Sequence, residues 1–205
     1  AIQTIVEDLE SIDPGYLVKP RLYNFADYGV PQFRERVLIV GIRKDTGFNF
    51  KHPKPTHGPL GERPYLSSGI ALQNVDLVPF NNEFQRPNIK VRQRLELIPE
   101  GGNYTAIPEG HPLYVKGLIS HVYRRLHRDK PSPTIMASGG GGTWGYHFAE
   151  PRALTNRERA RLQSFPDDFI FHGAYAEVRR QIGNAVPPMG VEVLARRLMT
   201  LFEGD

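Results

Sequence analysis

The sequence predicts an α/β fold on both flanks of the chain and an irregular, loop-rich zone between them. The N-terminal flank combines helically spaced apolar residues with a β-branched run, and the C-terminal flank returns to helical spacing with cap residues. In the middle, short apolar patches alternate with Pro and Gly, so long regular elements are not expected there. We therefore expect three zones, at residues 1–45, 46–150 and 151–205.

In the first zone, apolar residues recur at helical spacing over residues 2–12, which predicts an amphipathic helix that Asp13-Pro14-Gly15 ends. Residues 16–22 are a strand candidate. Residues 37–42 form a continuous β-branched run bounded by charges. Such a run is typical of a strand buried on both faces, in a sheet covered by helices.

The third zone contains residues that typically begin and end helices. Thr155 and Glu158 have the spacing of a capping box, which predicts a helix over residues 157–164. A second short helix is predicted over residues 177–182, with Gly183 at its C-terminal end. From Pro188 onward an apolar stripe predicts a final helix that packs into the core.

Composition excludes several classes of protein. The 205 residues include 26 Lys+Arg against 22 Asp+Glu, and none is cysteine, so the chain has no disulfide, thiolate metal site or cysteine nucleophile. The seven histidines lack zinc-site spacing, and we expect no metal. No stretch approaches the ~20 apolar residues of a membrane span, and no signal peptide is recognisable. We therefore expect a cytoplasmic protein without a membrane partner.

One extended segment concentrates polar side chains. Because side chains alternate along a strand, Gln32, Arg34 and Arg36 are expected to share one face. Two guanidinium groups and an amide suit phosphates or a base carbonyl. The residues alone fit a set of surface ion pairs equally well.

Two further segments invite a functional interpretation. Residues 140–145 satisfy G-x-G-x-x-G, but no helical period follows, so a dinucleotide loop is not expected. These glycines fit a close backbone approach to a strand of nucleic acid. Residues 181–188 form a small-residue turn that is either a connector between helices or a surface pressed against a ligand.

Taken together, three segments resemble the DNA (cytosine-5) methyltransferases. Residues 24–37 resemble their eighth motif, residues 152–167 their ninth, and residues 181–187 their tenth. The order agrees too, because family members carry a variable target-recognition domain between the eighth and ninth motifs. The resemblance implies the distal part of a Rossmann-like methyltransferase core with an inserted small, irregular, β-containing recognition domain.

The resemblance also implies roles for named residues. Arg36 is expected to bind a flipped cytosine at O2, with Arg34 and Gln32 organising the pocket and neighbouring phosphates. The tenth segment would form one wall of the pocket for S-adenosyl-L-methionine, through Asn184, Ala185 and Val186. The helix that begins at Arg157 and Glu158 is expected to brace the recognition domain.

Double-stranded DNA is the expected partner of the middle zone. Phosphate contacts are expected from Arg124, Arg125, Arg128 and Lys130, although a solvated basic face is the alternative. The segment that follows would enter a groove, with candidate contacts at Gly140, Gly141, Gly142, Thr143, Trp144 and His147.

The chain departs from the family in one respect. Family members attack cytosine with a cysteine from an upstream motif, and bind the cofactor mainly on an upstream glycine-rich motif. Without cysteine this polypeptide cannot perform the covalent step, so a catalytic partner is expected. Either an expressed fragment or the smaller subunit of a split bacterial restriction-modification enzyme fits, and we favour the split subunit. A DNA-binding module without catalysis is the alternative from another class.

Overall fold

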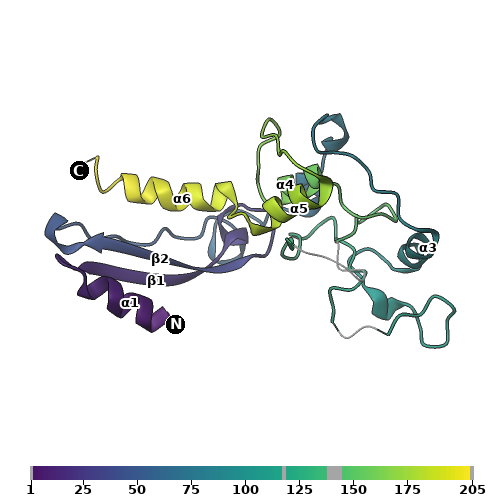
Figure 1. Ribbon diagram of the computed structural model, residues 1–205, viewed down its shortest axis with the longest axis horizontal. Helices are drawn as coiled ribbons and strands as arrows, with labels where there is room; N and C mark the ends of the chain where they lie inside the picture. The colour runs from purple at the N-terminus through teal and green to yellow at the C-terminus, as the bar shows by residue number, and fades with distance from the viewer. Residues whose placement is uncertain (1, 117–118, 138–144, 204–205) are drawn as a thin grey trace.

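The computed structural model describes residues 2–116, 119–137 and 145–203. Figure 1 shows an elongated molecule in which the N-terminal helix, a two-stranded ribbon and the C-terminal helix lie at one end. The helices Asn156–Leu162 and Tyr175–Asn184 lie in the centre, and most of the loop-rich middle of the chain occupies the other end. The two flanks of the sequence are thus neighbours in space.

The first zone folds as predicted in its elements but not in their burial. Helix α1 (Ile2–Ser11) packs against β1 (Tyr16–Asn24), which pairs antiparallel with β2 (Glu35–Arg43) from Tyr16 opposite Arg43 to Asn24 opposite Glu35. The prediction that residues 37–42 are buried on both faces is wrong for this chain. Val37 is 41% exposed, because β1 is the only strand that pairs with β2 among the described residues.

The middle zone is irregular, as predicted. It begins at the 3₁₀ turn η2 (Lys44–Thr46), which spans its boundary with the first zone. Its described helices are α2 (Ser68–Ala71) and α3 (Ile89–Leu97), and its other 3₁₀ turns are η3 (Gly58–Leu60), η4 (Val75–Leu77) and η5 (Tyr104–Ala106). Its β structure, within the described residues, consists of isolated bridges such as Arg125 with Tyr146. Asparagine caps begin several of these elements, as Asn88 does for α3 by accepting from two backbone N–H groups.

The third zone confirms the predicted helices. Helix α4 (Asn156–Leu162) opens with the capping box, because Thr155 accepts from the Glu158 backbone while Glu158 accepts from the Thr155 N–H. Helix α5 (Tyr175–Asn184) is longer than predicted, and Gly183 lies inside its last turn instead of ending it. Glycine is needed there for a different reason: a Cβ would overlap the backbone of Met136 and Ala137.

Helix α6 (Pro188–Met199) begins at the predicted proline, but it does not pack into a core. Gly190, which meets the ring of Phe25, is its one buried residue. Apolar side chains such as Val191 and Met199 stay exposed, because the ribbon beside α6 covers little of the stripe. The prediction of a core helix is therefore wrong within this chain.

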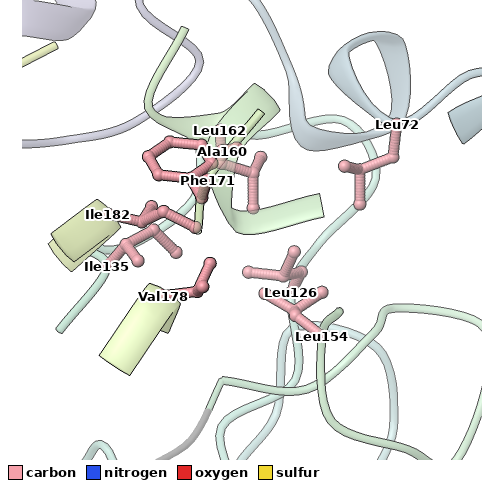
Figure 2. Packing of buried hydrophobic residues seen from close by; sticks show 9 residues of the cluster. All are labelled: Leu72, Leu126, Ile135, Leu154, Ala160, Leu162, Phe171, Val178 and Ile182. Atoms are coloured by element: carbon pink, nitrogen blue, oxygen red, sulfur yellow. The ribbon is translucent and has the colours of Figure 1, made fainter. Parts of the chain in front are cut away.

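The main core joins the middle and third zones. Figure 2 shows its buried side chains converging from α4, α5 and the loops around them: Leu72, Leu126, Ile135, Leu154, Ala160, Leu162, Phe171, Val178 and Ile182. A second cluster, around Leu95 and Tyr146, lies within the middle zone. Because the main core crosses residue 150, the loops of the middle zone rest on helices of the third.

Candidate functional site

Gln32 belongs to the polar face predicted for the segment before β2, but its side chain does not reach solvent. This side chain is fully buried, and its Nε2 donates to Leu162 O at 3.1 Å and to Gln163 Oε1 at 2.9 Å. Its Oε1 accepts from the Ile135 N–H at 2.9 Å. Both ends of the Gln32 amide are therefore committed to other segments of the chain, so Gln32 does not present its amide to a phosphate, and its expected part in organising the pocket stays a prediction.

Arg34 is also buried, with its guanidinium at the C-terminal end of α5. Nη2 donates to the carbonyl oxygens of Gly183 at 2.9 Å and Ala185 at 3.1 Å, and Nη1 donates to Ile135 O at 3.2 Å. The last carbonyls of a helix lack intrahelical partners and carry partial negative charge, so a guanidinium satisfies them well. Burial, with a smaller contribution from Arg36, lowers the pKa of Arg34 to about 10.

Arg36 differs from its two predecessors because it is exposed at the start of β2. Its Nη1 donates to the Glu35 carbonyl at 2.6 Å. Arg36 lines a hollow of about 470 Å³ together with Asn184 and residues 134–137. Arg34 and Arg36 are the charged residues of this lining, as far as the described residues define it, so the hollow is cationic.

The three residues expected to face a cofactor lie at the end of α5. Asn184 is exposed and lines the hollow, whereas Ala185 is half-buried and gives its carbonyl to Arg34. Val186 is exposed beyond the helix. Arg34 therefore fixes the backbone on both sides of Asn184.

Sequence reasoning missed Gln163, which joins two of these segments. It follows α4 directly, is fully buried, accepts from Gln32 and donates through Nε2 to Ile182 O at 2.6 Å. A polar residue at the end of an amphipathic helix, between Leu162 and Phe165, was the available signal. The sequence does not say which segments its amide reaches.

A basic groove of about 430 Å³ adjoins the hollow, and Thr134 lines both. Its lining includes Arg124, His127, Lys130 and the ring of Phe33, which is 40% exposed. The Arg124 Nε donates to Ser120 O at 3.2 Å, and Lys130 is exposed. Three of the predicted phosphate contacts, Arg124, Arg125 and Lys130, thus line one groove.

Arg128 lies at the surface near this groove, and its guanidinium is paired with a carboxylate. Its Nε is 3.0 Å from Glu100 Oε2, and its guanidinium carbon is 5.4 Å from the centre of the Phe148 ring. The adjacent carboxylate neutralises part of the positive charge that a phosphate would meet. Arg128 stays a candidate contact, with less free charge than Lys130.

Arg125 is a correction to the predicted phosphate contacts. Its guanidinium is buried and donates to four carbonyl oxygens, of Leu95, Ile98, His147 and Phe148, at 2.6–3.2 Å. These carbonyls belong to α3, to its C-terminal turn and to the strand-like segment near Tyr146. Arg125 lines the basic groove, but four backbone carbonyls already take its N–H groups, so its main role here is to hold the middle zone together.

His147 is a second correction, because it is buried and serves as an internal acceptor. Its Nδ1 accepts from the backbone N–H groups of Ala149 at 3.2 Å and Glu150 at 3.1 Å. Burial is the largest cause that lowers its pKa. The other predicted groove contacts, Gly140, Gly141, Gly142, Thr143 and Trp144, lie outside the described residues.

Arg157 and Glu158 at the start of α4 make structural contacts, as predicted, while their bracing of a recognition domain stays a prediction. The Arg157 guanidinium is fully buried and donates to the carbonyls of Phe80, Pro166 and Phe169 at 2.8–3.1 Å. Glu158 accepts from Arg152 at 2.7 and 2.8 Å while it completes the capping box. These contacts tie α4 to the middle zone.

The described residues contain no group of three His, Asp or Glu side chains placed to hold a metal ion. Among the same residues, every helix is too short or too polar to cross a membrane.

Known proteins resemble the chain in sequence. Residues 1–200 match the family model of the C-5 cytosine-specific DNA methylases. The Type II methyltransferase M.NgoFVII of Neisseria gonorrhoeae is 63% identical over all of this chain and 55% of its own length. M.BbvI of Brevibacillus brevis is 49% identical over 97% of this chain and 53% of its own length. The chain thus spans about half the length of the curated relatives it matches.

Solved structures share the fold. A DNA modification methyltransferase encoded within an Escherichia coli prophage superposes with a TM-score of 0.72 at 21% identity, over 94% of this chain and 63% of its own. The Entamoeba histolytica methyltransferase EhMeth gives a TM-score of 0.61 at 15% identity, over 97% of this chain and 57% of its own. The mixed helices and small ribbon are therefore part of a methyltransferase fold.

Proposed function

The chain belongs to the family of C-5 cytosine-specific DNA methylases, and we propose that it supplies the DNA-recognition part of such an enzyme together with one wall of the base pocket and one of the cofactor pocket. The enzyme would transfer a methyl group from S-adenosyl-L-methionine to C5 of a cytosine flipped out of a specific DNA sequence. The observation that carries this proposal is the cationic hollow, in which Arg36 and Asn184 come together from segments far apart in the sequence.

Arg36 is the residue we assign to the flipped base. A guanidinium has five N–H donors, and the Glu35 carbonyl takes a bond from Nη1. The remaining donors suit the O2 carbonyl of cytosine, on which negative charge grows when the ring is attacked. Extruding the base costs a few kcal/mol of stacking and pairing, which contacts of this kind help to offset.

The end of α5 fits one wall of a cofactor pocket. S-adenosyl-L-methionine supplies the methyl group, and the residues that would face it are the exposed Asn184 and Val186 with the Ala185 backbone. Arg34 holds the carbonyls of Gly183 and Ala185, so the Asn184 side chain starts from a fixed backbone. One wall orients a ligand but does not enclose it, so most of the binding would come from another segment.

The nucleophile must also come from another segment, because the sequence contains no cysteine. We propose that the segment carrying it docks on the ribbon end of the molecule. Apolar side chains stand exposed there on four elements: Ile2, Ile5, Leu17, Leu22, Val37, Val191 and Met199. Exposed apolar surface of this extent marks an interaction site. A segment docked there would bury β2 and α6, which the sequence predicts to be buried but which this chain alone leaves exposed.

The basic groove beside the hollow is our candidate path for the DNA backbone. Arg124 and Lys130 line it, and Thr134 connects it to the hollow that would hold the flipped base. Phosphates bound there would keep the target strand next to Arg36. Such contacts position DNA without reading its sequence, so specificity would come from other side chains of the middle zone.

The test is transfer of tritiated methyl groups to plasmid DNA by the chain alone, and by the chain mixed with the N-terminal half of a relative such as M.NgoFVII. Methylation by the mixture alone is the expected result. Methylation by the chain alone would contradict the need for a supplied nucleophile. Salt-sensitive DNA binding with no methylation in either sample would overturn catalysis in favour of a DNA-binding module.

A further inference from the structure

Gln163 contacts no exposed part of the site, yet its amide joins the two segments that form the walls of the hollow. Its Oε1 accepts from Gln32 Nε2 at 2.9 Å, and its Nε2 donates to Ile182 O at 2.6 Å. Gln32 lies four residues before Arg36, and Ile182 lies two residues before Asn184. The buried side chain of Gln163 thus connects the segment of Arg36, which we assign to the base, with the segment of Asn184, which we assign to the cofactor.

The direction of these hydrogen bonds is fixed by their partners. Ile182 offers a carbonyl, which accepts only, so the nitrogen of the Gln163 amide must face it. The Gln163 oxygen must then face Gln32, whose own oxygen is committed to the Ile135 N–H at 2.9 Å. Reversing either amide would place oxygen against oxygen in a fully buried position. The relay from Gln32 through Gln163 to Ile182 therefore has one arrangement.

We propose that Gln163 is a positioning residue for methyl transfer, which sets the spacing between Arg36 and Asn184 across the hollow. This inference rests on the proposed function. Transfer between two bound groups depends steeply on their separation, and a misplacement of about 1 Å costs on the order of 100-fold in rate. Gln163 acts on that separation through Gln32 and the last turn of α5, without touching either ligand.

The first test replaces Gln163 with methionine, which keeps the length of the side chain but makes neither hydrogen bond. In the methylating mixture, Gln163→Met is expected to lower kcat by roughly 10- to 100-fold. The KM for S-adenosyl-L-methionine should rise, while the Kd for DNA and its salt dependence stay within about threefold of wild type, because the basic groove does not contain Gln163. The exposed Gln73→Met is the matched control and should behave as wild type.

A second variant separates positioning from simple packing. In Gln163→Glu, an ionised carboxylate accepts from Gln32 but cannot donate to Ile182 O, whereas the protonated acid reproduces both bonds. Burial raises the pKa of a carboxyl group, so protonation should be reached near neutral pH. The activity of this variant relative to wild type should therefore increase as the pH falls from about 8 to about 6. All assays are run well below the unfolding temperature of each variant, measured by circular dichroism.

The outcomes distinguish this inference from the proposed function. A wild-type mixture that fails to methylate overturns the proposed function, and the positioning role with it. An active mixture in which Gln163→Met keeps the wild-type kcat and KM overturns the positioning role alone. A Gln163→Glu variant whose relative activity does not change with pH also overturns it, since the relay would then be dispensable.

Discussion

The guanidinium of Arg34 lies 2.9 Å from the carbonyl oxygen of Gly183, although the two residues are 149 positions apart in the sequence. This contact makes an arginine from the segment before β2 the cap of α5, and it brings the segment of Arg36 next to the segment of Asn184. Arg34 thus acts on the architecture of the site, while Arg36, two residues later, faces the hollow.

Replacing Arg34 should destabilise the chain. Arg34→Met leaves the carbonyls of Ile135, Gly183 and Ala185 without their charged donor, and we expect a loss of about 3 kcal/mol in the free energy of unfolding. Urea denaturation of the chain measures this. The exposed Arg43→Met on the same ribbon is the control and should unfold at nearly the wild-type urea concentration. An Arg34 variant as stable as that control would contradict the capping role.

Replacing Arg36 should instead remove activity. Arg36 is exposed, so Arg36→Ala is expected to fold normally and to lower methyl transfer by at least about 100-fold, because it removes a donor aimed at developing charge. Its affinity for DNA should fall only modestly. Tritium transfer in the mixture, with Arg43→Ala in parallel, gives the comparison, and unchanged turnover would exclude Arg36 from the base pocket.

Substitutions of Arg125 and Lys130 should have different effects, one on the stability of the chain and the other on its binding of DNA. Lys130→Met is expected to reduce the slope of log affinity against log salt by about 1 and to leave stability unchanged. Arg125→Met should cost about 3 kcal/mol in stability, because four carbonyls lose their donor, and should leave the salt slope as in wild type. Fluorescence anisotropy across a salt series and urea denaturation test the pair. The reverse pattern would restore Arg125 as a phosphate contact.

The chain alone should bind S-adenosyl-L-methionine weakly. In the proposed function the end of α5 supplies only one wall of the cofactor pocket, so we expect a Kd weaker than micromolar by calorimetry. Submicromolar binding by the chain alone would mean that the described residues form a more complete pocket than the exposed Asn184 and Val186 indicate.

Acidification should destabilise the fold through His147. Burial lowers the pKa of this histidine below its ordinary 6.5, so the unfolded chain takes up a proton that the folded chain resists. Stability should therefore fall as the pH drops below about 6.5. An asparagine side chain also accepts from backbone N–H groups two and three residues ahead, without titrating.

His147→Asn should accordingly weaken the loss of thermal stability between about pH 7.5 and 5.5. Thermal unfolding across this range tests the prediction. Equal pH dependence in the variant and wild type would place the acid sensitivity elsewhere, for example at His52 or His57, whose pKa values burial also lowers.

Local features were predictable because their causes are local. The capping box at Thr155, the proline that begins α6 and the paired strand candidates each depend on neighbouring residues, and each formed as expected. The three segments that resemble the methyltransferases are continuous stretches of sequence. They therefore identified the family of the chain without a structure. The absence of cysteine, with its consequence for the nucleophile, is likewise a property of the sequence alone.

Burial was decided by tertiary structure. Strand alternation places Gln32, Arg34 and Arg36 on related faces, but it does not say which of them another segment will cover. Leu162, Gly183 and Ile135, all more than 100 positions away, cover the first two and leave Arg36 open. For the same reason Arg125 and His147 looked like surface groups in a basic stretch until distant carbonyls and backbone N–H groups enclosed them. Residue type determined what each side chain is able to bind, and the folded chain determined which partner it meets.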